Sequence, residues 1–248
     1  MSVAHRPLIE TANNSSAIAD RLARDGFGFV PGPAMLAAAE ALGGTDWNGY
    51  AASWDALEPD RFMADGGTYR KRRFACFALA DGVLRRKPAQ PHFQTRDNNP
   101  LNGGIARVFA PVTDIIADHP MNRALLRLCA DAFAAVRPAP AWHVEMHQFR
   151  IEAQTGTGGL PTPEGTHRDG VDFVLTLMVE RANVAGGAST VVGEDGAARA
   201  EATLQEPLDS YLIDDRRMLH AVSPVHPIDP SRPGTRDMLV LTFRAEEF

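Results

Sequence analysis

Two short segments of the sequence carry side chains suited to binding a divalent metal ion. The first is Gly-Thr-His-Arg-Asp-Gly at 165–170, which ends directly before an apolar run. In an extended chain alternate residues point to the same side, about 6.5–7 Å apart, so His167 and Asp169 can face one ion while Arg168 points away. The second segment supplies His220, after a stretch long enough for several short strands and turns that bring the chain back beside the first pair.

Two imidazoles and one carboxylate on one side of an ion leave three coordination positions open, and this ligand set suits non-haem Fe(II). With one aspartate and two neutral histidines the ferrous ion keeps a net positive charge, which attracts an anionic chelating co-substrate. The far carboxylate of such a co-substrate needs a partner, and a guanidinium binds it through two parallel hydrogen bonds. Arg236, at the start of a later apolar run, is the candidate, with Arg232 as the alternative.

A strand that follows residue 140 carries a second set of polar residues. His143, Glu145 and His147 could also bind a metal, but no glycine relieves crowding there, and inward-facing polar side chains explain them better. From the same strand, Gln148 is a candidate contact for the co-substrate and Arg150 for the substrate.

The basic cluster at 70–73 and the polar segment at 85–104 supply further candidate substrate contacts. Alternation along a strand places two of the four basic side chains on the inner side, where Arg72 could bind a substrate carboxylate. The other interpretation is a solvated strand edge. Pro and Asn residues at 85–104 predict a long ordered loop with a functional role. Gln94 and Asn98 could supply amide contacts from this loop as an active-site lid, although turn chemistry explains them equally well.

The elements that must position these residues change character near residue 140. Apolar spacing and end signals predict helices at 15–24, 35–42 and 122–136, with strands at 27–30 and 69–79. Later β-rich runs at 142–152, 173–181, 188–192, 200–204, 210–214 and 238–244 predict a sandwich or barrel. We see no linker, so we expect one domain over 1–248, with a helical and lid portion at about 1–140 and the strands of the metal site at about 141–248.

Composition argues against several classes of protein. The chain has 248 residues, 44% hydrophobic and 23% charged, which is ordinary for a globular enzyme or binding protein. Its net charge of −6 argues against a dedicated binder of nucleic acid or of anionic membranes. We recognise neither an export signal nor an apolar run of membrane-spanning length, and we expect a cytoplasmic protein. Cys76 and Cys129 lie far apart in the sequence and are expected to be buried free thiols.

Three motifs taken together resemble the Fe(II)/2-oxoglutarate dioxygenases. They are Thr-His-Arg-Asp-Gly at 166–170, Leu-His-Ala-Val-Ser-Pro-Val at 219–225 and Gly-Thr-Arg-Asp-Met-Leu-Val-Leu-Thr-Phe at 234–243. The segments 161–165 (Pro-Thr-Pro-Glu-Gly) and 92–104 are similar, more narrowly, to the bacterial branch that hydroxylates free L-amino acids. That branch includes the isoleucine dioxygenases and BsmA-like proteins.

The resemblance implies a mainly β protein with flanking helices, built on a double-stranded β-helix, or jelly roll. It implies that His167, Asp169 and His220 bind Fe(II) and act in catalysis, and that Arg236 binds the 5-carboxylate of 2-oxoglutarate. The implied reaction uses O₂ to hydroxylate a small free amino acid and releases succinate and CO₂.

Two other functions compete with this hypothesis. One is a non-catalytic, metal-binding jelly-roll protein in stress or biofilm signalling, which the complete ligand set argues against. The other is a metal hydrolase or isomerase on a cupin-like barrel, which usually uses more histidines. The expected partner is a small molecule rather than nucleic acid or membrane, and assembly into a homo-oligomer stays open.

Overall fold

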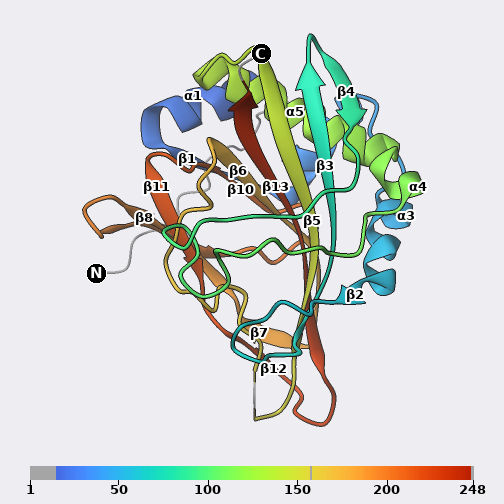
Figure 1. The fold of residues 1–248 in the computed structure, drawn as a ribbon, viewed down its shortest axis with the longest axis vertical. Helices are drawn as coiled ribbons and strands as arrows, with labels where there is room; N and C mark the ends of the chain where they lie inside the picture. The colour runs from blue at the N-terminus through green and yellow to red at the C-terminus, as the bar shows by residue number, and fades with distance from the viewer. Residues whose placement is uncertain (1–14, 157, 247–248) are drawn as a thin grey trace.

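The computed structural model describes residues 15–156 and 158–246 (Figure 1). Its helices are α1 (Ser15–Asp25), α2 (Gly32–Ala41), α3 (Trp47–Ala51), the 3-10 helix η1 (Ala52–Ala56), α4 (Asp114–Ala117) and α5 (Pro120–Val136). Its strands are β1 (Phe27–Val30), β2 (Glu58–Pro59), β3 (Arg70–Ala80), β4 (Val83–Arg86), β5 (Ala141–Ala153), β6 (Phe173–Ala182), β7 (Val184–Gly186), β8 (Ala188–Gly193), β9 (Ala198–Thr203), β10 (Ser210–Asp214), β11 (Met218–Val222), β12 (Val225–Pro227) and β13 (Gly234–Glu246).

One large antiparallel sheet dominates the structure. Its strand order is β1-β10-β6-β13-β5-β3-β2, with β4 paired to β3. The central strands β5 and β13 are each 13 residues long and pair from end to end. Smaller sheets, β11-β8-β9 and β12-β7, complete the fold. The mainly β class with flanking helices that the sequence predicts is confirmed.

The helices cover one face of the large sheet. Helix α5 begins at Pro120, whose fixed φ suits a first helical turn, and the Met121 N–H donates to the side chain of His119. Its apolar side contributes Phe133, which stacks on Phe173 of β6 at 4.6 Å between ring centroids and meets Phe243 of β13 edge-on at 5.0 Å. Burying one such ring contributes about 2–3 kcal/mol. Alternate side chains of these strands therefore point to the other face.

The chain between β4 and α4, green in Figure 1, crosses that other face of the sheet. Backbone hydrogen bonds hold its end to β3, from Phe74 N to Ala110 O (2.9 Å) and from Val112 N to Phe74 O (3.0 Å). Within the segment, the Gly103 N–H donates to Asn99 O at 2.8 Å. The long ordered loop predicted at 85–104 is present beyond the end of β4.

The remaining differences from the predicted elements are small. The short elements α3, η1, α4, β2, β4, β7, β11 and β12 are not predicted, because runs of two to five residues carry too little periodicity. Cys76 and Cys129 are free and buried, as expected. Among the residues described, no helix has both the length and the apolar character needed to cross a membrane.

Candidate active site

A cavity of about 420 Å³ lies on the inner face of the large sheet. Its walls come from alternate residues of β3, β5 and β13, from β11, and from the segments 92–99 and 161–171. A volume of this size is within the range of small-molecule sites. Most of the candidate site residues line this cavity, including His167, Asp169 and His220.

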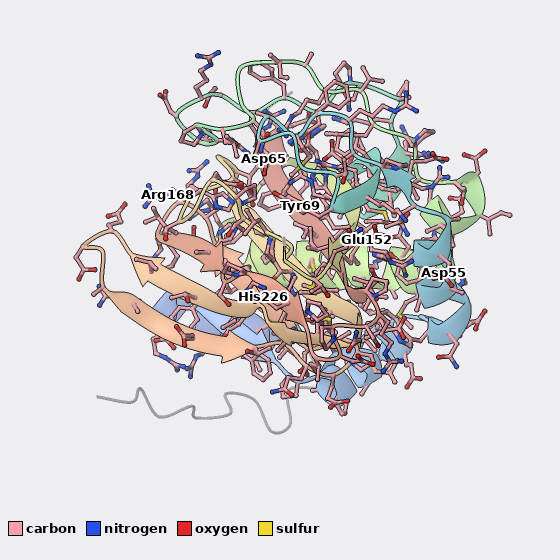
Figure 2. All side chains as sticks on the ribbon, turned by 90° about the horizontal axis from the view of Figure 1, so that it is seen from below. Asp55, Asp65, Tyr69, Glu152, Arg168 and His226 are labelled. Carbon is pink, nitrogen blue, oxygen red and sulfur yellow. The ribbon has the colours of Figure 1, made fainter. Side chains whose placement is uncertain are left out.

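The structure brings His167, Asp169 and His220 together on this cavity. The two Nε2 atoms each lie 3.7 Å from a different oxygen of Asp169, and the two imidazole centroids are 4.5 Å apart. One ligand atom from each residue lies within 4.8 Å of the other two. Arg168, labelled in Figure 2, takes no part, since it pairs with Glu194 in the turn after β8. These donor atoms fit one divalent metal ion.

Backbone contacts fix the two segments that carry these side chains. His167 and His220 exchange two backbone hydrogen bonds, of 3.0 and 2.9 Å. The carboxylate of Asp215 accepts three more, of 2.8–3.0 Å, from the consecutive N–H groups of residues 169–171. Burial, together with the charge of Asp169, raises the pKa of Asp215 to about 6. The geometry of the loop that carries the candidate metal ligands His167 and Asp169 therefore depends on Asp215.

The two histidines of the candidate site differ in protonation. Nδ1 of His167 donates to Gly165 O at 3.0 Å, because a carbonyl can only accept, and this leaves Nε2 for the metal. Burial opposes the charged form of His167, but the hydrogen bond and charge of Asp169 outweigh it and raise the pKa to about 9. Burial and the charge of His167 lower the pKa of His220 to about 4. In the metal-free protein at neutral pH, His167 is therefore charged and His220 is neutral.

Metal binding must displace the proton from Nε2 of His167. Protons compete with the metal below the pKa of about 9. Apparent Fe(II) affinity should therefore rise about tenfold per pH unit between pH 6 and pH 8, and level off above about pH 9. Anaerobic calorimetric titrations in buffers of different ionisation enthalpy would measure both affinity and released protons. A flat affinity without proton release would contradict this expectation.

Two glycines of the loop that carries His167 and Asp169 allow a matched comparison. Gly165 and Gly170 have φ angles of +82° and +80°, where a side chain is strained. A Cβ at Gly165 meets nothing, whereas a Cβ at Gly170 overlaps the amide of Asn98. Gly165→Ala should lower the free energy of unfolding by about 1 kcal/mol, and Gly170→Ala by about 2–3 kcal/mol. Urea unfolding would measure both, and adding Asn98→Ala should recover part of the Gly170→Ala loss. An equal loss of unfolding free energy in the two variants would contradict the close approach of Asn98 to Gly170.

Arg236 points into the cavity from β13. Its side chain is buried, and its Nε has no hydrogen-bond partner. In the described part of the chain no carboxylate pairs with it. Burial, with the charge of Arg181, lowers the pKa of Arg236 to about 9. Arg232 lies elsewhere, with a 69% exposed side chain paired to Asp229 at 3.3 Å. Arg236 is thus the arginine that fits an anionic ligand of the cavity.

Glu145 forms a second polar cluster on the cavity wall with His92 and His147, and these three also offer ligand atoms within 4.8 Å. The guanidinium of Arg72 can only donate, so Nδ1 of His147, 2.6 Å away, accepts. The proton of this neutral imidazole therefore lies on Nε2, toward Glu145, and that nitrogen cannot bind a metal. Burial lowers the pKa of His147 to about 3, which keeps the ring neutral. The inward-facing polar interpretation of this strand agrees with the structure.

Gln148 and Arg150 do not line the cavity, in contrast to expectation. Inward positions on β5 are odd-numbered, from 143 to 151, so these two side chains point to the opposite face of the sheet. Gln148 donates to Ser53 Oγ at 2.8 Å. Arg150 bonds to Asp237 at 2.6 and 2.8 Å and to Asp55, labelled in Figure 2. The predicted contacts of Gln148 with the co-substrate and of Arg150 with the substrate are wrong, because strand alternation turns even-numbered side chains of β5 away from the cavity.

The other three predicted contacts do line the cavity: Arg72, Gln94 and Asn98. Sequence analysis missed two further buried side chains there, His92 and Arg107. Both belong to the crossing segment, where no periodicity indicates which side chains turn inward. Their mutual backbone hydrogen bonds, 2.9 Å in both directions, become apparent only in three dimensions.

Comparison with known proteins decides the family. The model of a family described as 2OG-Fe dioxygenase matches residues 51–242. The chain belongs to this family. The cofactors of these dioxygenases are Fe(II), 2-oxoglutarate and O₂, as the resemblance implied. Three convergent donors and one unpaired, buried guanidinium fit the metal and the dicarboxylate. The enzyme class and the jelly roll with outer helices are confirmed, and a non-catalytic role is not favoured.

Several relatives of the dioxygenase are similar over most of its length. A bsmA homolog from Methylobium petroleophilum PM1 is 35% identical, covers 98% of both chains and superposes with a TM-score of 0.87. A 3(1)-hydroxy-L-isoleucine 4-dioxygenase from Pantoea ananatis is 25% identical over 92% of this chain and 96% of that protein. An L-isoleucine-4-hydroxylase from Bacillus thuringiensis is 25% identical over 63% and 66%. The bacterial branch named by the resemblance is confirmed.

Proposed function

We propose that this dioxygenase hydroxylates a small free L-amino acid with an aliphatic side chain. The observation that carries the proposal is the convergence of His167, Asp169 and His220 beside the unpaired Arg236 in one cavity. The relatives from Pantoea ananatis and Bacillus thuringiensis support the substrate class, since their names specify isoleucine or its hydroxylated form.

Some residues of the cavity would bind the metal and the co-substrate, and others would exclude water from the reacting centre. Fe(II) bound with 2-oxoglutarate supplies the activation of O₂, with release of succinate and CO₂. His167, Asp169 and His220 would hold the metal, and Arg236 would hold the far carboxylate of 2-oxoglutarate. Val222, Met238 and Val240 supply apolar wall. Such a wall keeps water from the reacting centre and protects the reaction from side chemistry.

We further propose that the enzyme works in the cytoplasm as one domain. The two buried free thiols, Cys76 and Cys129, are compatible with a reducing compartment. One apolar cluster draws on residues from Ile18 in α1 to Phe243 in β13, which supports a single folding unit. The net charge of −6 favours a small molecule over nucleic acid as the partner.

A screen of amino acids tests this function. Purified enzyme with Fe(II), ascorbate, 2-oxoglutarate and O₂ is mixed with each common L-amino acid, and succinate and product mass are followed. One or a few aliphatic amino acids should stimulate succinate and give a product about 16 Da heavier. If iron is bound but no amino acid raises the rate of succinate formation above the rate without substrate, the result would favour the non-catalytic alternative.

A further inference from the structure

A cluster of buried charges lines the cavity beside the metal-binding residues. Arg70, Arg72 and Arg107 are only 6%, 3% and 2% exposed, so water solvates their charges poorly. Asp60 acts on all three arginines, Glu145 acts on Arg72 and Arg107, and Glu164 acts on Arg107. Three guanidiniums therefore face three carboxylates, and the buried charges balance. A balanced site of this kind, where donors and an acceptor stay without partners, fits a ligand that carries both charges.

Asp60 and Glu145 already have closer partners than Arg72 and Arg107. Asp60 accepts from Arg70 at 2.7 Å, and its distance to Nη1 of Arg72 is longer, at 3.6 Å. Glu145 accepts from His92 at 2.9 Å. Among the described residues, therefore, no carboxylate accepts a hydrogen bond from Arg72 or Arg107.

Arg72 and Arg107 are held in place with donor capacity to spare. The guanidinium of Arg72 lies between the rings of Phe109 and Phe149, 3.6 and 4.5 Å from their centroids. Arg107 donates from Nη2 to Gln94 at 2.9 Å. The Nε atoms of both arginines are buried without a hydrogen-bond partner. Preorganised, unsatisfied donors of this type bind a carboxylate with little loss of side-chain freedom.

Gln94 shows that the Arg107 guanidinium lies close to the metal ligands. The same amide accepts from Arg107 through its oxygen and donates through its nitrogen to Oδ1 of Asp169 at 3.3 Å. One amide group therefore separates Arg107 from the metal-binding carboxylate. A small molecule bound at Arg107 is within reach of the reacting centre.

The cavity also offers a buried carboxylate. Glu164 precedes the metal-binding loop, its side chain is 9% exposed, and its Oε2 has no partner. Its Oε1 lies 3.5 Å from Nε2 of His167. Burial and the charge of Arg70 lower the pKa of Arg107, and the charge of Glu164 opposes that shift, so the two groups act on each other. Besides Arg236, the cavity thus presents a free donor on each of Arg72 and Arg107 and a free acceptor on Glu164, as far as the described residues show.

Resting on the proposed function, we propose that Arg72 and Arg107 bind the α-carboxylate of the amino acid and that Glu164 binds its α-ammonium group. Both charged ends of the zwitterion are then held by the protein. The side chain is the part left free to approach the metal. The charged side chains of the cavity therefore favour an unmodified amino acid over an amide or a peptide-bound residue as the substrate.

Binding of L-isoleucine to the anaerobic enzyme loaded with Fe(II) and 2-oxoglutarate tests the assignment, by calorimetry. Arg107→Gln and Arg72→Gln should each weaken binding about 10- to 100-fold and leave 2-oxoglutarate affinity within twofold. Arg73→Gln is the matched control, because Arg73 leaves the same strand on the other face and bonds to Ala56 O and Pro111 O. L-Isoleucine amide should bind wild-type enzyme weakly and lose nothing further in Arg107→Gln.

Glu164→Gln should weaken L-isoleucine about tenfold and leave the hydroxy-acid analogue, which lacks the ammonium group, unaffected. Loss of Fe(II) affinity in Glu164→Gln would instead place Glu164 in the metal site and overturn the ammonium assignment.

Two results would overturn the carboxylate assignment. One is binding of L-isoleucine by both arginine variants within twofold of the Arg73→Gln control. The other is binding of L-isoleucine amide as tight as L-isoleucine by the wild-type enzyme, a result that needs no variant to fold. If amino acids are hydroxylated in the screen while either result holds, only this assignment fails. If no amino acid is hydroxylated, the proposed function itself fails.

Discussion

Replacing Asp169 by alanine should lower succinate formation by more than about 100-fold and weaken Fe(II) binding to a similar degree. Asp169 is the one carboxylate among the three converging donors, and each histidine lies 3.7 Å from one of its oxygens. Without it, two imidazoles remain, and the positive charge of the metal is not offset. Succinate assays and anaerobic Fe(II) titration measure the two losses, and circular dichroism checks the fold.

Arg168→Ala is the matched control for this experiment. Arg168 is adjacent in sequence, but it points to solvent and pairs with Glu194. An exposed pair of this kind contributes at most about 1 kcal/mol, so turnover should stay near the wild-type rate. If Asp169→Ala retained wild-type succinate yield while folded, the assignment of the metal ligands would be wrong.

Arg236→Ala should raise the KM for 2-oxoglutarate about 100-fold, with a smaller effect on kcat. The buried guanidinium has no carboxylate partner among the residues that the structure describes, so its removal leaves the far carboxylate of the co-substrate unpaired in a partly dry cavity. Arg236→Lys should recover part of the affinity, since it keeps the charge and loses the two-pronged hydrogen bond. Steady-state assays at varied 2-oxoglutarate measure these constants.

Arg232→Ala separates the two arginines that the sequence could not rank. Arg232 is exposed and bonded to Asp229, so its loss should leave the KM for 2-oxoglutarate unchanged. An unchanged KM in Arg236→Ala together with a raised KM in Arg232→Ala would reverse the assignment.

Residues that share one strand or one tight motif were predictable from the sequence. The two-residue spacing of His167 and Asp169 dictates that both face one side, and the structure places them so. The pairing of His220 with His167 required only that the chain return, which the resemblance supported and two backbone hydrogen bonds provide.

The sequence did not predict which side chains face the cavity where this depends on the phase of strand alternation or on the path of an irregular segment. On β5 the sequence offers candidates on both faces, since His143, Glu145 and His147 are interpreted as inward-facing while Gln148 and Arg150 are candidate ligand contacts. Only the odd-numbered set lines the cavity. Helices packed on the even-numbered set decide the phase, and they come from distant sequence. Arg107 lies on an irregular segment, where neither period nor motif marks its side chain as inward.

Asp215 and His220 belong to the same short connection between β10 and the middle of β11. At one end of this connection, Asp215 accepts backbone hydrogen bonds from the loop that carries His167 and Asp169. At the other end, His220 supplies the third candidate ligand. The stretch from 215 to 220 therefore acts as a spacer of set length. Insertions or deletions in 215–220 would separate the three candidate ligands, whereas the exposed turn between β8 and β9 can change length without moving them. Loop grafting aimed at new specificity should therefore leave residues 215–220 unchanged.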